Sequence, residues 1–147
     1  MAKLAYAESY RELVIYQKSR ALANEIFEIS KDFPKEETYS LTDQIRRSSW
    51  SVGAQIAEAW GKRLYERHFI SKITDADAEQ LETQHWIEIA LDCNYLSQEK
   101  SSELLQKCSE IGKMLNSMMK NASKFCNPQT QRISELQTEY ITKQFEP

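Results

Sequence analysis

The amino-acid sequence predicts an all-α protein, an antiparallel up-down bundle of four helices. The 147 residues include only three Gly and three Pro, too few turn-forming residues for a sandwich or barrel of many short strands. Apolar residues recur with helical spacing in four successive segments, and short connections between such segments place neighbouring helices antiparallel. A chain of this length suffices for one domain with a single core.

The first two helices follow from apolar stripes and from the residues that end them. In the first segment, spacings of 7, 4, 3 and 4 place five residues on one stripe: Ile15, Leu22, Ile26, Ile29 and Phe33. Pro34 ends this helix, because proline disfavours helical geometry at the residue before it. The second helix begins near Ser40, where the run to Asp43 resembles a capping box, and ends at Gly61. Its stripe comprises Leu41, Ile45, Ser48, Val52, Ile56 and Ala59.

The third and fourth helices complete the bundle. The third pattern runs from about Leu64 to Leu96. The fourth follows a Ser97 cap and alternates steps of 4 and 3 through Leu104, Cys108, Ile111, Leu115, Met118, Ala122 and Phe125. We therefore assign residues 1–126 to the four-helix bundle. Residues 127–147 have a more polar composition and form a C-terminal tail, either a short docked helix or a solvated arm.

Charge and cysteine content restrict the class of protein. The formal net charge of −3 argues against a uniformly basic chain that coats nucleic acid. From Arg46 to Lys72, basic residues nevertheless outnumber acidic ones. From Asp75 to Glu110 there are instead nine acidic residues and only two Lys. Three cysteines without metal-type spacing suit a reducing compartment. Without an apolar stretch typical of a signal peptide or a membrane span, we expect a cytoplasmic protein.

The second helix has small residues and a Trp on the side opposite its core stripe. At 100° per residue from Val52, Trp50 and Gly61 project about 160–180° away. A large aromatic side chain beside small residues is typical of a protein interface; the alternative is a surface stripe that is merely rich in Ala, the best helix former. We predict an oligomer interface at Trp50, Ala54, Ala57, Trp60 and Gly61.

The third helix carries polar residues on the side that we expect to meet the core. Asp77, Gln80 and Gln84 project within about 40° of Ile73. A buried carboxylate needs a partner, and the candidates are Gln55 and Arg46, so the predicted buried polar layer is Arg46, Gln55, Asp77, Gln80 and Gln84. Such a layer either fixes helix register or forms a catalytic cluster. Without a visible nucleophile–base pair, we expect no catalytic residues.

Metal and cofactor motifs are absent from the sequence. Glu82 and His85 have the Glu-x-x-His spacing of di-iron bundles, but those sites need two such motifs, and both side chains project away from the expected core direction. His68 lies in no recognisable ligand motif either, so we expect both histidines at the surface. No phosphate-binding loop, dinucleotide fingerprint or nucleophile elbow occurs. We expect neither a metal nor a cofactor.

Basic residues near the turn between the second and third helices suggest a nucleic-acid contact. They could bind phosphates, with Trp60 or Tyr65 available for stacking on bases. The alternative is a solvated loop with ordinary charges. The candidate residues for this contact are Arg47, Lys62, Arg63, Arg67 and Lys72.

Several of these segments resemble one protein family. Leu13–Ser19, with the sequence LVIYQKS, looks like the first-helix signature of the 23S rRNA intervening-sequence proteins, which are encoded inside bacterial large-subunit ribosomal RNA genes. Phe33–Glu36 (FPKE), followed by Leu41–Arg47 (LTDQIRR), resembles that family's entry to its second helix. The resemblance covers roughly Leu13 to Phe125.

Two motifs depart from the family pattern. The family's Asn-Ile-Ala-Glu-Gly is here Gln55–Ala59 (QIAEA), with the glycine displaced to Gly61. Its third helix usually carries a Ser and, three residues later, a Glu before Leu-Glu-Thr-Gln; here these positions are Asp77 and Gln80, ahead of Leu81–Gln84. The carboxylate is thus displaced by one helical turn, which changes its partners.

The resemblance implies a four-helix bundle that assembles as a homo-oligomer, specifically a ring-like pentamer, with no known enzymatic activity. It also implies a link to RNA or to a reverse transcriptase, because a related branch serves as an accessory protein of diversity-generating retroelements. We therefore expect a non-enzymatic oligomeric scaffold or adaptor. The alternative is an accessory protein that binds RNA or a reverse transcriptase through the basic turn.

Overall fold

A computed structural model of the protein describes residues 7–126, and four long helices dominate it. These are α1 (Val14–Ser30), α2 (Leu41–Gly61), α3 (Glu66–Asp92) and α4 (Gln98–Lys120). Three short helical segments accompany them: η1 (Tyr10–Glu12), η2 (Lys35–Glu37) and α5 (Ala122–Phe125). The predicted C-terminal tail, residues 127–147, lies outside the described residues and stays a prediction.

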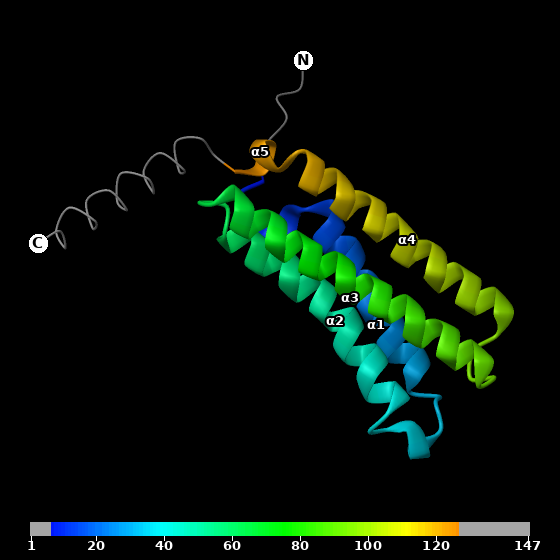
Figure 1. Ribbon diagram of the computed structural model, residues 1–147. Coiled ribbons are helices and arrows are strands. Elements are labelled where there is room, and N and C mark those ends of the chain that lie inside the picture. Colours follow the sequence, from blue (N-terminus) through cyan, green and yellow to red (C-terminus); the bar gives the residue numbers. More distant parts are fainter. Residues whose placement is uncertain (1–6, 127–147) are drawn as a thin grey trace, which may run out of the picture.

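The four long helices pack in the order of the chain. Helix α1 contacts α2, α2 contacts α3, α3 contacts α4, and α4 returns to α1. The connections are short, so consecutive helices run antiparallel along an elongated bundle, as Figure 1 shows. This arrangement confirms the predicted all-α, up-down architecture.

The ends of the helices show which local signals the chain uses. The Ser97 hydroxyl accepts a hydrogen bond from Lys100 N at 3.1 Å and caps α4 as predicted. Ser40 forms no capping bond at α2, because its hydroxyl donates to Glu37 Oε2 at 2.6 Å instead. Helix α3 ends earlier than predicted, at Asp92, because Asn94 adopts φ 61° and turns the chain toward α4.

The core is formed mainly by the apolar stripes predicted from the sequence, although Ile29 and Phe125 are only partly buried at its edge. All four long helices contribute fully buried side chains, among them Ile26, Ile45, Ile56, Phe69, Ile73, Ile87, Leu104, Ile111 and Leu115. Burial of this kind is the main favourable contribution to folding. No helix among residues 7–126 is both long enough and apolar enough to cross a membrane.

Ion pairs close the bundle where α4 returns to α1. Lys18 on α1 pairs with Glu110 on α4. Glu25 on α1 contacts Lys100 at 2.7 Å and Lys107 at 2.6 Å, both on α4. Partial burial alone would raise the pKa of Glu25, but the hydrogen bonds from the two lysines outweigh it and lower that pKa. The charges between α1 and α4 are therefore satisfied within the chain.

Two glycines allow close contacts between neighbouring helices. A Cβ added at Gly53 on α2 would lie 3.6 Å from the ring of Tyr16 on α1, an ordinary van der Waals distance. A Cβ at Gly112 on α4 would lie only 2.8 Å from Nε2 of Gln80 on α3. Gln80 is 3% exposed, so its amide has little space into which it could move. Gly112 is thus required by the α3–α4 contact, whereas Gly53 is not required to the same degree.

We predict opposite effects of Gly53→Ala and Gly112→Ala on the free energy of unfolding. Alanine at position 53 should raise it by up to about 1 kcal/mol, because glycine is the poorer helix former. Alanine at position 112 should lower it by about 1 kcal/mol, because displacing the Gln80 amide breaks a buried hydrogen bond, which costs more than the helical gain. Urea denaturation of both variants measures the difference. A stabilising Gly112→Ala would contradict the close contact.

Candidate interaction surface

At the predicted interface, Trp50 of α2 forms an aromatic pair with Phe27 of α1. Trp50 on α2 is 52% exposed, and its ring centroid lies 6.1 Å from that of Phe27 on α1. The Trp50 ring therefore lies over the α1–α2 seam, with one side on Phe27 and much of the rest in solvent. Helical periodicity explains this position, since Trp50 projects about 160° from Val52, which is buried.

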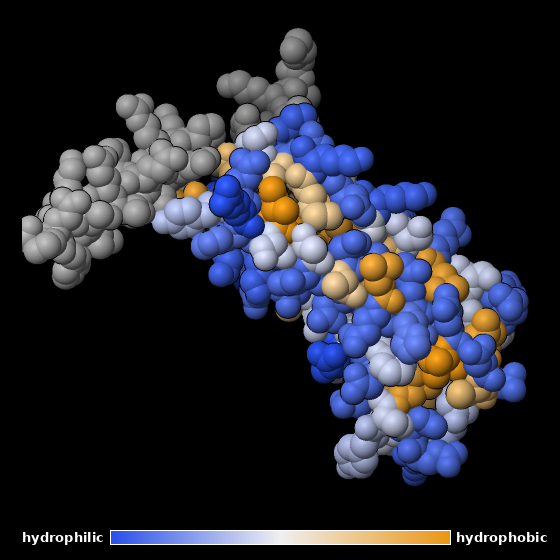
Figure 2. Space-filling view, in the orientation of Figure 1, coloured by the Kyte–Doolittle hydropathy of each residue, from blue (hydrophilic) through white to orange (hydrophobic). Residues whose placement is uncertain are grey.

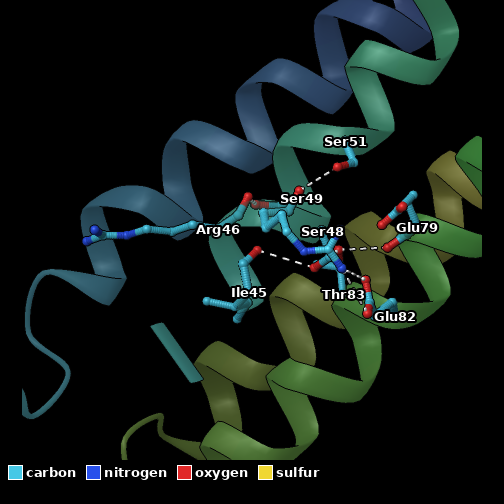
Figure 3. A network of polar contacts seen from close by, with 9 residues as sticks. Ile45, Arg46, Ser48, Ser49, Ser51, Glu79, Glu82 and Thr83 are labelled. Atoms are coloured by element: carbon cyan, nitrogen blue, oxygen red, sulfur yellow. Dashed lines mark hydrogen bonds and ion pairs between the residues drawn. The ribbon is translucent and has the colours of Figure 1, made fainter. Parts of the chain in front are cut away.

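Two cationic side chains, Arg46 and Lys31, lie over the Phe27 ring of this aromatic pair. The Arg46 guanidinium carbon lies 4.6 Å from the Phe27 ring centroid, and Lys31 Nζ lies 4.9 Å from it. Arg46 Nε also donates to Ser30 Oγ at 2.8 Å. Arg46 thus belongs to the α1–α2 edge, and Figure 3 shows it pointing away from the contact between Ser48 and Thr83.

The remaining residues of the predicted interface differ in exposure. Ala54 and Gly61 are exposed, and Ala57 is half-buried on the same side of α2. Trp60 is half-buried and is covered by Arg63 at the end of α2. The Arg63 guanidinium carbon lies 3.5 Å from the Trp60 ring centroid, and Arg63 Nε donates to the Trp60 carbonyl oxygen at 2.8 Å. We define the Trp50 face as the surface formed by Phe27, Arg46, Trp50, Ala54, Ala57 and Gly61.

The structure brings together three of the five residues of the predicted polar layer. Gln80 Nε2 donates to Asp77 Oδ1 at 2.9 Å, and Gln84 Nε2 donates to Gln80 Oε1 at 2.7 Å. The row lies on α3 and packs against Gly112 of α4. Because even a Cβ at Gly112 would come too close to Gln80, there is no room for a substrate at this point. The arrangement suits the fixing of helix register.

Arg46 and Gln55 have other partners, which corrects their assignment to this layer. Gln55 Oε1 accepts a hydrogen bond from Lys72 Nζ at 3.4 Å on the α2–α3 side. The prediction took Ile73 as the centre of the buried side of α3, but the buried residues centre about 50° further toward α2. Asp77 and Gln80 consequently face Gly112 of α4, and Gln84 is bonded to Gln80.

A second polar contact, between α2 and α3, was missed by the sequence analysis. Thr83 Oγ1 lies 2.9 Å from Ser48 Oγ and 2.9 Å from the carbonyl oxygen of Glu79 (Figure 3). Ser48 and Thr83 are both fully buried. The hydroxyls therefore satisfy one another in the buried contact between these helices.

Two carboxylates lie at the edge of this contact. Burial raises the pKa of the Glu79 carboxyl, and a hydrogen bond with Glu82 and the charge of Glu82 raise it further, while Arg47 opposes the shift. Arg47 Nη2 lies 3.4 Å from Glu82 Oε2. Arg47 is thereby paired on the α2–α3 side, away from the basic turn in which the sequence analysis had placed it.

The other predicted nucleic-acid contacts divide between the α2–α3 side and the turn. Lys72 Nζ contacts Glu58 at 3.0 Å and Asp75 at 3.7 Å, and the hydrogen bond with Glu58 raises its pKa. Lys62 and Arg67 are exposed at the turn. A cavity of about 430 Å³ opens there, lined by Tyr65, Glu66, Arg67, His68 and Ile70.

The groups capable of nucleophilic or metal chemistry are not assembled into a centre. Cys93 is exposed, whereas Cys108 and Cys126 are buried, and all three are unpaired. Burial raises the pKa of the Cys108 thiol to about 12, so it stays protonated at neutral pH. Both histidines are exposed, as predicted. Within residues 7–126, no group of three potential ligands could hold a metal ion.

Comparison with known proteins places this bundle in a family. A search of the curated proteins found no match. Among solved structures, the chain is similar to a protein of unknown function of the S23 ribosomal protein family from Bacteroides thetaiotaomicron. The identity is 31%, the TM-score is 0.66, and the match covers 73% of this chain and 99% of that chain. The profile of the 23S rRNA-intervening sequence protein family matches residues 11–117. The chain belongs to the family of 23S rRNA-intervening sequence proteins.

Proposed function

We propose that the protein is a non-enzymatic scaffold or adaptor that works as a homo-oligomer, with the Trp50 face as its contact between copies. The observation that carries the proposal is the half-exposed Trp50, whose ring packs at a tilt against Phe27. Large aromatic side chains of this kind provide most of the binding energy in protein interfaces. The ring-like pentamer implied by the family resemblance is part of this proposal.

The surroundings of Trp50 support its use as an interface. Ala54 and Gly61 are exposed on the same side of α2 as Trp50, and a Cβ at Gly61 would meet no other atom within 4 Å. A partner helix could therefore approach the α2 backbone closely without displacing side chains. Packing of Trp50 on Phe27 also restricts its rotation in advance, which reduces the entropy lost on association.

The proposal of a protein without enzymatic activity rests on the chemistry of its polar groups. The Asp77–Gln80–Gln84 row is packed against Gly112, and the Ser48–Thr83 pair is fully buried between α2 and α3. Both groups stabilise contacts between helices and leave no space for a substrate. Their arrangement is that of structural polar contacts in a bundle core.

We predict that Trp50→Glu dissociates the oligomer. Loss of a central aromatic anchor should raise the dissociation constant at least about tenfold. Sedimentation velocity over a series of protein concentrations measures this shift. Tyr39→Glu is the matched control, because Tyr39 is 94% exposed and lies outside the Trp50 face. Unchanged sedimentation of Trp50→Glu would place the interface elsewhere.

A second candidate function is RNA binding, or binding of a reverse transcriptase, at the turn between α2 and α3. The cavity there combines the rings of Tyr65 and His68, whose centroids are 5.1 Å apart, with the exposed Arg67. Aromatic rings beside cations suit an unpaired base and its phosphate. Lys62 adds an exposed positive charge to the same turn.

We predict for this second function that single-stranded RNA binds in a salt-dependent manner and that the Lys62→Ala, Arg63→Ala, Arg67→Ala triple variant loses the binding. Each lost phosphate contact should reduce the salt slope by about 0.7. The control variant changes Lys35, Lys113 and Lys120, all exposed, to Ala. An electrophoretic shift that the first triple change does not alter would reject this function.

A further inference from the structure

The chain leaves the described bundle beside the α2–α3 turn. Helix α5 contacts α3 and α4, and Figure 1 shows it at the end of the bundle where α3 starts. The last described residue, Cys126, is 3% exposed. Burial raises the pKa of its thiol, the charge of Glu66 raises that pKa further, and Arg63 opposes the shift, so Cys126 lies near both charged groups. The segment 127–147 therefore starts at the edge of the cavity that Glu66 helps to line.

Apolar side chains are exposed around this exit point. Leu64 is 38% exposed and Tyr65 is 43% exposed, and Ile70 and Met119 are only partly buried. Thr74 Oγ1 lies 3.3 Å from Met119 Sδ, which places the end of α4 beside the first turns of α3. In Figure 2 an apolar patch interrupts the hydrophilic surface between these two helix ends. We define the end surface as Leu64, Tyr65, Arg67, His68, Ile70 and Met119.

The same end of the bundle carries unpaired positive charge. Glu66 is the one carboxylate among residues 59–70, and residues 111–126 contain none. Glu8 and Glu12 belong to η1, which packs on α1 and α2 instead. A partner of the end surface should therefore combine apolar side chains with negative charge. The exposed cations without an ion pair in the described chain are Lys62, Arg67, Lys120 and Lys124.

The C-terminal segment of the chain has a matching apolar stripe. Ile133, Leu136 and Tyr140 are spaced 3 and 4 residues apart, which places them on one side of a helix. Pro128 disfavours helical geometry at the residue before it, so we expect the chain to change direction after α5. The seven residues from Cys126 to Ile133 span up to about 23 Å when extended. This length is sufficient for the stripe to return to the end surface.

The charge of this segment also matches the end surface. Glu135 and Glu139 are the only charged residues among residues 133–142. They lie one helical turn apart and flank the apolar stripe. The basic residues Arg132 and Lys143 stand at the two ends of this run, so its middle is acidic. Carboxylates beside apolar side chains are what the unpaired cations and exposed apolar groups of the end surface require.

We propose that the C-terminal segment folds back on its own bundle and packs its apolar stripe on the end surface. Glu135 and Glu139 then face the unpaired cations, and an apolar side chain of the stripe fills the cavity of about 430 Å³. Removal of both apolar surfaces from water favours this contact. The proposal requires neither self-association nor RNA binding. A docked segment covers the turn on which the second candidate function depends, so it competes there with RNA.

Carbethoxylation of the two histidines tests this proposal in the full chain. His68 belongs to the end surface, whereas His85 is exposed elsewhere on α3. Diethyl pyrocarbonate modifies accessible histidines, and mass spectrometry follows each site separately. In the Ile133→Ser, Leu136→Ser, Tyr140→Ser variant, His68 should react about tenfold faster than in the wild-type chain, because the undocked state is otherwise a minor population of roughly a tenth. His85 should react at the same rate in both chains.

A matched control changes polar residues of the same segment, Gln131, Gln137 and Gln144, to Ser. This variant keeps the apolar stripe and should leave His68 as protected as in the wild-type chain. Equal rates at His68 in the wild-type chain and the apolar variant would overturn the proposal, as would a control variant that reacts as fast as the apolar variant. Protection of His68 that increases with protein concentration would assign the end surface to another copy of the chain and overturn docking within one chain. The measurement is made in dilute protein without RNA, so failure of either proposed function leaves its result unchanged.

Discussion

The structure depends on the packing of α2 between α1 and α3, where α2 presents small side chains to both neighbours. Gly53 admits the Tyr16 ring of α1 on one side, and Ser48 meets Thr83 of α3 on the other. Because Ser48 and Thr83 are both fully buried between the two helices, the inner surface of α2 has no space for an indole there. Trp50 is consequently placed outside, over Phe27. Close packing inside the bundle thus creates the exposed aromatic surface on which the proposed assembly relies.

The distribution of charge follows from the same packing. Lysines at the α1–α4 and α2–α3 contacts are paired with carboxylates of the facing helix, as in Glu25 with Lys100 and Glu58 with Lys72. Ion pairs that are exposed to water add little to the stability of the fold, but they neutralise the charges at these contacts.

Periodicity predicts the fold well and the orientation of α3 poorly, and particular residues show why. The steps of 3 and 4 through Leu104, Cys108 and Ile111 identify a buried stripe because burial itself selects apolar residues at that spacing. On α3, however, polar Gln80 and Thr83 are buried while Leu81 is exposed, so apolar positions alone give the wrong centre. Because of that error, Arg46 and Gln55 were assigned to the polar layer. The Ser48–Thr83 contact was missed, because its hydrogen bond joins side chains of two different helices.

The central claim is that Trp50 is buried between copies of the chain, and hydroxyl-radical footprinting at increasing protein concentration tests it most directly. Trp50 should become protected as the oligomer forms, while Tyr39, which lies outside the Trp50 face, keeps its reactivity. If Trp50 remained as reactive as in the dilute protein at concentrations where sedimentation shows an oligomer, the claim would be contradicted.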